Sequence, residues 1–351
     1  MDIILTIVIR VLAILMVFAT LLPLLRHDFW TFRVFEFPRL QKWVINLVII
    51  SIFFAYFDDF QVIDIILLVL LSGSILFLSY QIYPYTVFSP IQLSRVKTDS
   101  KNNIRLLISN VYQYNKQYGK LIKLISKNDP DIILLVETSA DWRETMDKAI
   151  GDQYTERVLE DQENTYGMLL FSKLKLENTH VNYLIKKEIP SIETNIVLGY
   201  NRIKLFCLHP EPPVPSENAW ATDRDAEILI VGKKAAEESL PVIVAGDLND
   251  VAWSHTTELF LKTSDLLDPR RGRGFYNTFN AKYPLLRWPL DHIFCSHHFQ
   301  LIKLTTLPSI NSDHFPVMVD LALTFKHDEH KNLEMDNEEK VEVEEKIEKA
   351  E

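Results

Sequence analysis

Cysteine is scarce in this sequence, and there is no excess of positive charge. The 351 residues include only Cys207 and Cys295, each inside an apolar stretch and without metal-type spacing. We expect both to be small buried side chains, which leaves the redox compartment open. The formal net charge is −10, of which −7 lies in residues 327–351. The remaining −3 gives no sign of the broad positive surface that is typical of nucleic-acid-binding proteins.

Long apolar runs are abundant at one end of the chain. They occupy residues 3–25, 43–57 and 62–80. The first run is long enough to cross a bilayer and contains a single charge, Arg10, whose side chain can extend to the near surface. A cleaved signal peptide would explain this run alone, but three successive runs without a small-residue cleavage site favour three transmembrane helices. We therefore predict an integral membrane protein with an anchor in the lipid bilayer at residues 1–85, followed by a linker at 86–102.

The opposite end of the chain is strongly acidic. Residues 327–351 contain eleven Asp or Glu against four Lys. This composition predicts a solvated tail, disordered or transiently helical, without chemistry of its own. The residues between linker and tail, 103–326, are enough for one well-buried domain. No protein partner can be deduced from the sequence.

Short apolar, β-rich runs recur in this domain. They occupy residues 104–109, 131–137, 167–172, 203–208, 241–246, 291–296 and 315–323. Between the first two, GKLIKLISK has helical periodicity and ends at Asn128, Ser216 could cap a helix that continues to about Leu240, and Trp253-Ser254 begins another. The pattern predicts a mixed α/β sandwich without internal repeats.

Polar residues suited to metal or phosphate chemistry follow or begin these apolar runs. They are Asn110, Glu137, His209, Asp247, Asn249, Asp291, Ser312, Asp313 and His314. Taken singly, an Asp or Asn at a strand end is more often a turn or capping residue, and a His beside proline is more often a packing residue. Turn propensity does not explain six strand ends that all carry such residues, so we expect them to meet in one site.

The residue types in this set indicate a particular chemistry. Glu137 and the aspartates are hard oxygen ligands of the kind that hold Mg²⁺ or Mn²⁺ beside a phosphate. His209 and His314 could donate and accept protons on opposite sides of a phosphorus centre. Asn110 and Asn249 supply amide donors that orient phosphate oxygens. Together these residues are suited to metal-assisted hydrolysis of a phosphate ester or anhydride by water.

The order N…E…H…GDxN…DHI…SDH, over about residues 103–325, resembles the endonuclease/exonuclease/phosphatase (DNase I-like) superfamily. The resemblance implies a four-layer α/β sandwich, in which two packed mixed sheets are flanked by helices and the active site lies at one edge. It also implies that Glu137 is the principal metal ligand for Mg²⁺ or Mn²⁺, with Asn110 beside it and Asp313 in the metal network.

The same resemblance implies roles for five further residues. Asp247 would position or deprotonate the attacking water, and Asn249 would contact phosphate. His314, oriented by Asp291, would contact phosphate or transfer a proton. His209 would face the leaving group or the phosphate.

Two departures from many nucleases bear on the substrate. A proline-rich loop, PEPPVPSENAW, follows His209, and the stretch RRGRGF at 270–275 is either a mobile basic loop for an anionic head group or a solvated turn. With the anchor, the chain resembles the membrane-bound bacterial branch, which is thought to act on lipid-linked pyrophosphate. We expect a phosphohydrolase acting on a lipid-linked or small phosphate. The alternatives are a membrane-tethered nuclease and a non-catalytic phosphate-binding module.

The side of the membrane on which the domain lies is indicated by two arguments that conflict. Basic residues crowd the first loop and follow the third run, at Arg26, Arg33, Arg39, Lys42, Arg95, Lys97 and Lys101. By the positive-inside rule this places the domain on the cytoplasmic side of a bacterial inner membrane. An interfacial position for the first loop would weaken that signal, and a lipid-linked pyrophosphate substrate would favour the outer side. We prefer the cytoplasmic side narrowly.

Overall fold

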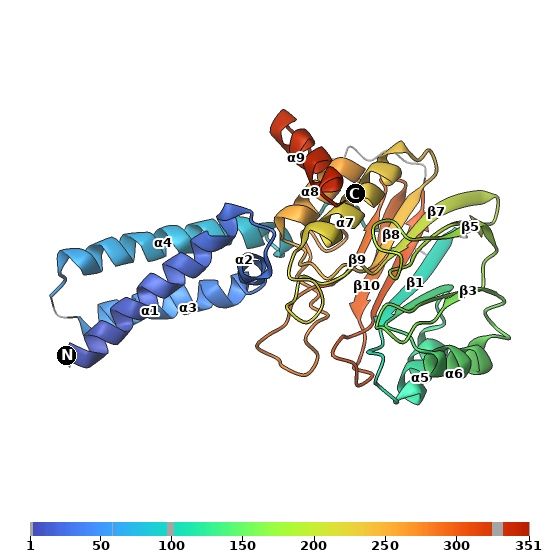
Figure 1. The fold of residues 1–351 in the computed structure, drawn as a ribbon, viewed down its shortest axis with the longest axis horizontal. Coiled ribbons are helices and arrows are strands. Elements are labelled where there is room, and N and C mark those ends of the chain that lie inside the picture. The colour runs from blue at the N-terminus through green and yellow to red at the C-terminus, as the bar shows by residue number, and fades with distance from the viewer. Residues whose placement is uncertain (1–2, 58, 97–101, 325–332, 351) are drawn as a thin grey trace.

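Three long apolar helices project from one side of an α/β domain (Figure 1). The computed structural model describes residues 3–57, 59–96, 102–324 and 333–350. Parts of the predicted linker and acidic tail, 97–101 and 327–332, lie outside these ranges. The three helices are α1 (Ile3–Leu21), α3 (Arg39–Tyr56) and α4 (Val62–Ile82). Each is long and apolar enough, counted with its flanking turn, to cross a membrane.

The anchor helices pack through a small apolar core that includes Ala13, Phe53 and Leu71. The single charge in the first helix does not simply extend to the membrane surface, as the sequence led us to expect. Arg10 instead pairs with Asp64 at the start of α4, with Nε and Oδ1 2.8 Å apart. This pairing lowers the cost of holding a charge inside an apolar helix.

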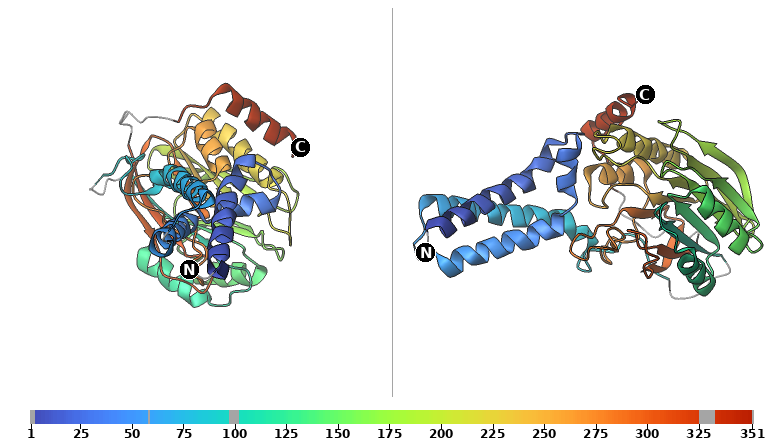
Figure 2. Two further views of the ribbon diagram at one scale, coloured as in Figure 1. Left: turned by 90° about the vertical axis from the view of Figure 1, so that its left-hand side faces the viewer. Right: turned by 60° about the horizontal axis from the view of Figure 1, so that its bottom comes forward.

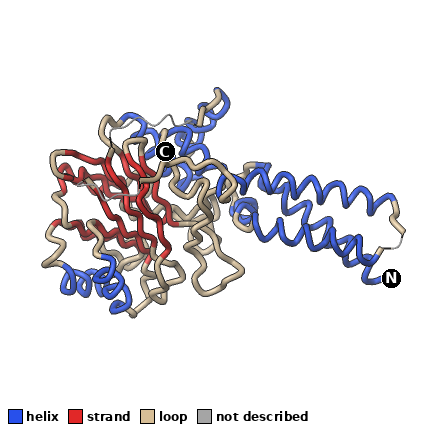
Figure 3. The backbone as a smooth tube through the Cα atoms, turned by 180° about the vertical axis from the view of Figure 1, so that it is seen from behind, coloured by secondary structure: helices blue, strands red, loops and turns tan. Residues whose placement is uncertain are grey.

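The domain contains two mixed sheets (Figure 3). The six-stranded sheet has the order β10-β11-β1-β2-β4-β3, and the five-stranded sheet has the order β5-β6-β7-β8-β9. The strands are β1 (Asn103–Asn110), β2 (Ile132–Val136), β3 (Glu156–Glu160), β4 (Met168–Ser172), β5 (Leu176–Asn182), β6 (Ser191–Leu198), β7 (Asn201–Leu208), β8 (Val242–Asp247), β9 (Asp291–Cys295), β10 (Phe299–Thr306) and β11 (Val317–Leu323).

Side chains that alternate along each central strand build the layers. In β8, Ile243 and Ala245 face the six-stranded sheet, whereas Val242 and Val244 face helices. Helices α5 (Tyr118–Asn128) and α6 (Ala140–Ile150) cover the first sheet. Helices α7 (Thr222–Glu237) and α8 (His255–Ser264) cover the second (Figure 2). The predicted four-layer α/β sandwich is confirmed.

The acidic C-terminal segment does not behave as the predicted solvated tail over residues 337–348. These residues form helix α9 (Asn337–Glu348), which begins with a capping box between Asp336 and Glu339. Val343 and Ile347, four residues apart and therefore on one helix face, are buried against the α7 and α8 layer. The helical alternative is therefore what the structure shows over these residues. Full solvation does not hold for Val343 and Ile347, because net charge outweighed this short apolar stripe in the sequence argument.

The loop between α1 and α3 docks on the α/β domain. It contains η1 (Leu22–Leu25), α2 (Trp30–Arg33) and η2 (Val34–Glu36). The backbone N–H of Trp30 donates to Ala219, and that of Ala221 donates to Asp28, both at 2.8 Å. These bonds use the backbone just before α7, so α7 begins at Thr222 and not near Ser216 as predicted.

Candidate active site

The predicted site residues lie at the ends of central strands because of how those strands pair. Strands β1 and β2 run parallel, with Asn110 opposite Val136, so that Asn110 and Glu137 emerge at one edge. Strands β7 and β8 are also parallel, which brings His209 beside the end of β8. The antiparallel strand β9 begins there, with Asp291 opposite Asp247.

Two residues at this edge adopt backbone conformations that ordinary side chains avoid. Glu137 has φ of 57° and Asn249 has φ of 51°, both in the left-handed region. Such conformations persist where the surrounding structure enforces them, and they concentrate at functional sites. Just before Asp247, a Cβ on Gly246 would lie 1.9 Å from the carbonyl oxygen of Leu208, so no larger residue fits.

Asn110 joins the carboxylates of the two sheets. Its Nδ2 atom donates to Oε1 of Glu137 at 2.7 Å and to Oδ2 of Asp247 at 2.9 Å. Its Oδ1 accepts the backbone N–H of Tyr112 at 3.0 Å, which fixes the orientation of the amide because an N–H requires an acceptor. In this arrangement Asn110 bridges two carboxylates through its nitrogen, and its oxygen does not face them.

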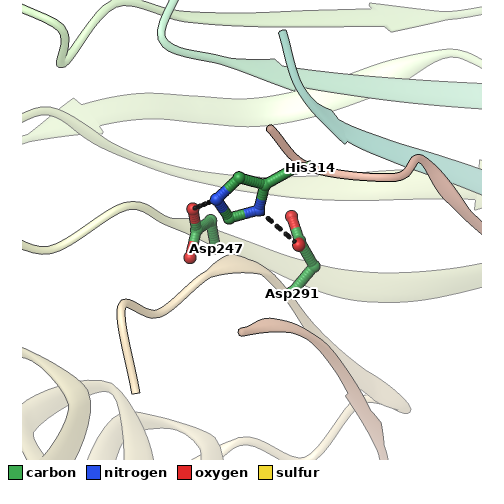
Figure 4. Close-up of side chains that lie close together, drawn as sticks. All are labelled: Asp247, Asp291 and His314. Atoms are coloured by element: carbon green, nitrogen blue, oxygen red, sulfur yellow. Dashed lines mark hydrogen bonds and ion pairs between the residues drawn. The ribbon is translucent and has the colours of Figure 1, made fainter. Parts of the chain in front are cut away.

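His314 lies between two aspartates (Figure 4). Its Nδ1 is 2.8 Å from Oδ2 of Asp291, and its Nε2 is 3.6 Å from Oδ2 of Asp247. Burial alone would lower the pKa of this imidazole, but Asp291 and Asp247 outweigh burial and raise the pKa of His314 to about 10. Asp291 therefore holds the His314 ring in place, and the protonated ring can stabilise negative charge.

His209 and Asn249 border the same edge. Nδ1 of His209 lies 3.1 Å from the carbonyl oxygen of Asp247, which can only accept, so Nδ1 carries a proton and Nε2 is left for a ligand. The Nδ2 of Asn249 donates to the carbonyl of Pro210 at 2.9 Å, which uses one of its two N–H bonds. Its backbone N–H donates to Oδ1 of Asp247 at 3.0 Å.

Hard oxygen donors for a divalent cation are present in this arrangement. Glu137 is only partly covered, and burial raises the pKa of its carboxyl above the usual value despite His209 and the bond from Asn110. A bound cation would remove that cost by compensating the buried negative charge. Asp313 follows Ser312, whose hydroxyl contacts it at 3.3 Å. The carboxylate of Glu137 therefore fits a hard divalent ion.

A second group of possible ligands consists of Asp247, Asp291 and His314, whose donor atoms lie within 4.8 Å of one another. Both ring nitrogens of His314 face carboxylates. The edge of the sheets therefore offers two positions for a cation, one at Glu137 and one at this group.

The sequence profile of the Endonuclease/Exonuclease/phosphatase family matches residues 103–314. The chain belongs to this family. Members of the family are hydrolases that act on phosphate ester bonds, and they generally use divalent metal ions. A search among curated proteins finds no match.

Solved structures support the same family fold. The chain is similar to an endonuclease/exonuclease/phosphatase from Beutenbergia cavernae, with 16% identity, 64% of this chain and 72% of that chain covered, and a TM-score of 0.51. It is also similar to the human Nocturnin catalytic domain with bound sulfate, with 16% identity, coverage of 66% and 98%, and a TM-score of 0.52. It is also similar to humanized D. rerio TDP2, with 14% identity, coverage of 63% of this chain and 99% of that chain, and a TM-score of 0.52.

The prediction of a ligand-binding loop at residues 270–275 is wrong. The arginines of 270–275 do not form a mobile basic loop. Arg270 is buried and forms ion pairs with Asp268, Arg271 pairs with Glu258, and Arg273 bonds to backbone carbonyls. The sequence did not reveal these acidic partners, because Glu258 lies in a different element.

Three residues near the site were not singled out from the sequence. Arg224, in α7, donates to the backbone carbonyl of Asn249 at 2.9 Å and so supports the loop after β8. The Tyr166 ring lies 5.7 Å from that of His209, and its hydroxyl donates to Glu217. The Phe279 ring lies 5.0 Å from that of His314. All three lie in segments without a recognisable motif, so the sequence offered no reason to assign them to the site.

Proposed function

We propose that the protein is a membrane-anchored, divalent-metal-dependent phosphohydrolase that cleaves a lipid-linked or other small phosphate ester or anhydride. The continuous series of contacts from Glu137 through Asn110, Asp247 and His314 to Asp291 carries this proposal. In this proposal the series joins a metal-binding carboxylate, a general base and an imidazolium at one sheet edge. All the motif residues are retained, which argues against a module that only binds phosphate.

Each residue has a chemical role in this proposal. The carboxylate of Asp247, held by Asn110, would orient and deprotonate the attacking water. The imidazolium of His314, held by Asp291, would stabilise charge on the phosphate oxygens. His209 would present Nε2 to the leaving group.

Two further residues complete the proposed site. The second N–H bond of the Asn249 amide would contact phosphate. Mg²⁺ or Mn²⁺, held by Glu137 with Asp313 and Asn110 nearby, would polarise the phosphate and offset its charge when bound.

Two observations support a small or lipid-linked substrate over a nucleic acid. Three apolar helices suggest a membrane beside the domain. The arginines of 270–275, the most concentrated basic stretch of the domain sequence, are used in internal contacts and so do not offer a track for a polyanion.

The test is a phosphate-release screen with the full chain in detergent micelles. Polyprenyl pyrophosphates, phospholipids and nucleic acids would be offered with Mg²⁺, with Mn²⁺ and with EDTA. We expect metal-dependent turnover of a polyprenyl or small phosphate that disappears with EDTA. Full activity in EDTA contradicts the metal requirement, and turnover confined to DNA or RNA supports the nuclease alternative.

We further propose that the catalytic domain lies on the cytoplasmic side of a bacterial inner membrane. The loop between α1 and α3 and the end of α4 both meet the domain, whereas the N-terminus and the turn before α4 lie at the far end (Figure 1). The first loop carries most of the basic residues near the spans, although Arg33 is used in internal ion pairs. Alkaline phosphatase fused after Ser89 and after Asp59 distinguishes the sides, since an active Ser89 fusion with a silent Asp59 fusion reverses the assignment.

A further inference from the structure

A cavity of about 520 Å³ lies where the anchor meets the catalytic domain. Leu24 and Tyr80, near the ends of α1 and α4, form part of its wall on the anchor side. His255 and Lys262 of α8 form part of its wall on the domain side. None of the proposed active-site residues lines it, so this cavity is a separate feature of the molecule.

Arg39, the first residue of α3, lines this cavity. Its residue is only 6% exposed. Among the residues that the structure describes, none accepts a hydrogen bond from its side chain or forms an ion pair with it. Of the two carboxylates that line the cavity, Glu258 pairs with Arg271 and Glu36 pairs with Arg33 through Oε1. The Oε2 atom of Glu36 accepts no hydrogen bond from a described residue. Glu36 and Glu258 attract this guanidinium at longer range. A largely buried cation without a hydrogen-bond acceptor is costly, and an anion in the cavity would supply one.

Further cations surround the mouth of the cavity. Arg26 and Lys262 both line it, and each is held by a carboxylate of the α9 helix, Glu342 at 3.1 Å and Glu339 at 2.6 Å respectively. The side chain of Arg26 is 58% exposed, so it can reach a ligand without breaking a buried contact. Basic side chains thus approach the cavity from α3, from α8 and from the loop after α1.

The part of the wall near the ends of α1 and α4 is largely apolar, with Leu24, Phe77 and Tyr80, and it continues into helices that are long enough to span a membrane. Leu24 is 53% exposed and Tyr80 is 80% exposed. Tyrosine is typical of the boundary between membrane and water, because its ring is apolar and its hydroxyl is polar. A ligand that fits both walls has an anionic head for Arg39 and an acyl chain for the helix ends.

We propose that this cavity binds the phosphate group of an anionic membrane phospholipid, with Arg39 as the buried ligand and Arg26 and Lys262 at the mouth. The planar guanidinium can donate two parallel hydrogen bonds to phosphate, which favours arginine for this contact. The bound lipid joins the anchor to the catalytic domain. The site is independent of the catalytic function proposed above.

Native mass spectrometry of the full chain released from micelles tests this site. Phosphatidylglycerol and phosphatidylcholine with identical acyl chains serve as probes. We expect the wild type to retain one phosphatidylglycerol with at least a tenfold preference over phosphatidylcholine. Arg39→Gln should reduce that retention at least tenfold. The control Arg202→Gln removes an arginine that does not line the cavity, is 57% exposed and is paired with Glu177, and it should leave retention unchanged.

Three results would overturn the proposal. The first is equal retention of the two lipids by the wild type, and the second is undiminished retention of phosphatidylglycerol by folded Arg39→Gln. The third is full displacement of the lipid by millimolar inorganic phosphate, which would indicate that the site binds a soluble anion instead. If thermal unfolding shows that Arg39→Gln is not folded, Arg26→Gln decides. This variant should weaken phosphatidylglycerol retention severalfold, and unchanged retention counts against the site.

Discussion

The guanidinium of Arg33 donates a hydrogen bond of 2.7 Å to the carboxylate of Asp225, which lies 192 positions later in the chain. Both side chains are buried. Lys346 and Arg224 also donate to Asp225, so residues from the anchor loop, α7 and α9 share one carboxylate. Although burial alone would raise it, these cations hold the pKa of Asp225 far below its usual value. The anchor is therefore packed on the domain and is more than a tether.

Asp225→Ala is expected to destabilise the full chain severely. The substitution leaves three buried cations without their common carboxylate, and breaking a buried pair in this way costs about 3–5 kcal/mol. Thermal unfolding in detergent micelles measures the loss. The control Glu177→Ala removes two exposed ion pairs, with Lys175 and Arg202, and should have a much smaller effect. Equal shifts in the two variants would mean that the Asp225 cluster contributes little.

Glu137→Gln is expected to abolish metal-dependent turnover without unfolding the domain. The amide keeps the shape of the side chain but lacks the charge that holds a hard cation. We expect phosphate release to fall by a factor of about 10²–10⁴, with the loss of any Mg²⁺-induced rise in Tm. Glu144→Gln, an exposed change on α6, is the control and should behave as the wild type. A Glu137→Gln enzyme that Mg²⁺ still stabilises would place the cation elsewhere.

Asp291→Asn tests whether His314 acts as a charge-stabilising imidazolium. The variant loses the carboxylate that contacts Nδ1 at 2.8 Å, so the ring is less well oriented and less readily protonated. We expect kcat to fall by a factor of about 10²–10⁴ while KM changes little. Asp320→Asn, which removes a carboxylate paired with Arg105 outside the site, should retain kcat. A loss confined to KM would indicate a substrate-binding role instead.

Salt dependence distinguishes a pocket enzyme from a nuclease. A nuclease that contacts phosphates along a polymer loses affinity steeply as salt rises, whereas an enzyme that binds one phosphate group responds mildly. We expect the full chain in micelles to nick plasmid DNA poorly at any salt concentration. A fragment of residues 95–326 is a poor substitute, because it lacks the Arg33 and Lys346 contacts to Asp225. Strong nicking that falls steeply with salt, and that Glu137→Gln abolishes, would make the nuclease the leading function.

Glu227 predicts a pH dependence of stability. Burial, together with repulsion from Asp223 and Glu211, raises the pKa of this carboxyl to about 8. The folded state then keeps a proton that the unfolded chain loses above pH 4.5, so this group lowers the free energy of unfolding by about 1.4 kcal/mol per pH unit from there to about pH 8. Glu227→Gln should remove this slope in unfolding measurements between pH 5 and 9. A variant with the wild-type slope would show that Glu227 is ionised in the folded protein.

Most of the strands that the sequence predicted are buried on both faces. The run at 131–137 appears as β2, in which every residue is buried, and the helix ending at Asn128 is confirmed as α5. Strands β3, β5, β6 and β10 were not predicted. Strand β5, LENTHVN, lies at a sheet edge and has no buried residue, so its sequence resembles that of a loop.

The site residues were predicted because they follow strands, but their contacts were not. The alignment of Asn110 with both Glu137 and Asp247 depends on how the two sheets pack, which no local pattern encodes. The same holds for the pairing of Arg271 with Glu258, which turned a predicted ligand loop into a packed one. Sequence patterns indicate which residues meet at an edge, whereas long-range packing decides which of their atoms face each other.

The position of Lys346 in the Asp225 cluster has a consequence for the order of events during synthesis. This lysine contacts Asp28, which lies 318 positions earlier, in the segment that joins the first two apolar helices. A ribosome delivers Asp28 and Arg33 long before Lys346, so the junction stays incomplete until residue 346 has emerged. Folding of the three apolar helices and folding of the sandwich can therefore precede the closure of this junction, and a nascent chain that stops before residue 346 keeps an α/β domain that is less firmly held to those helices.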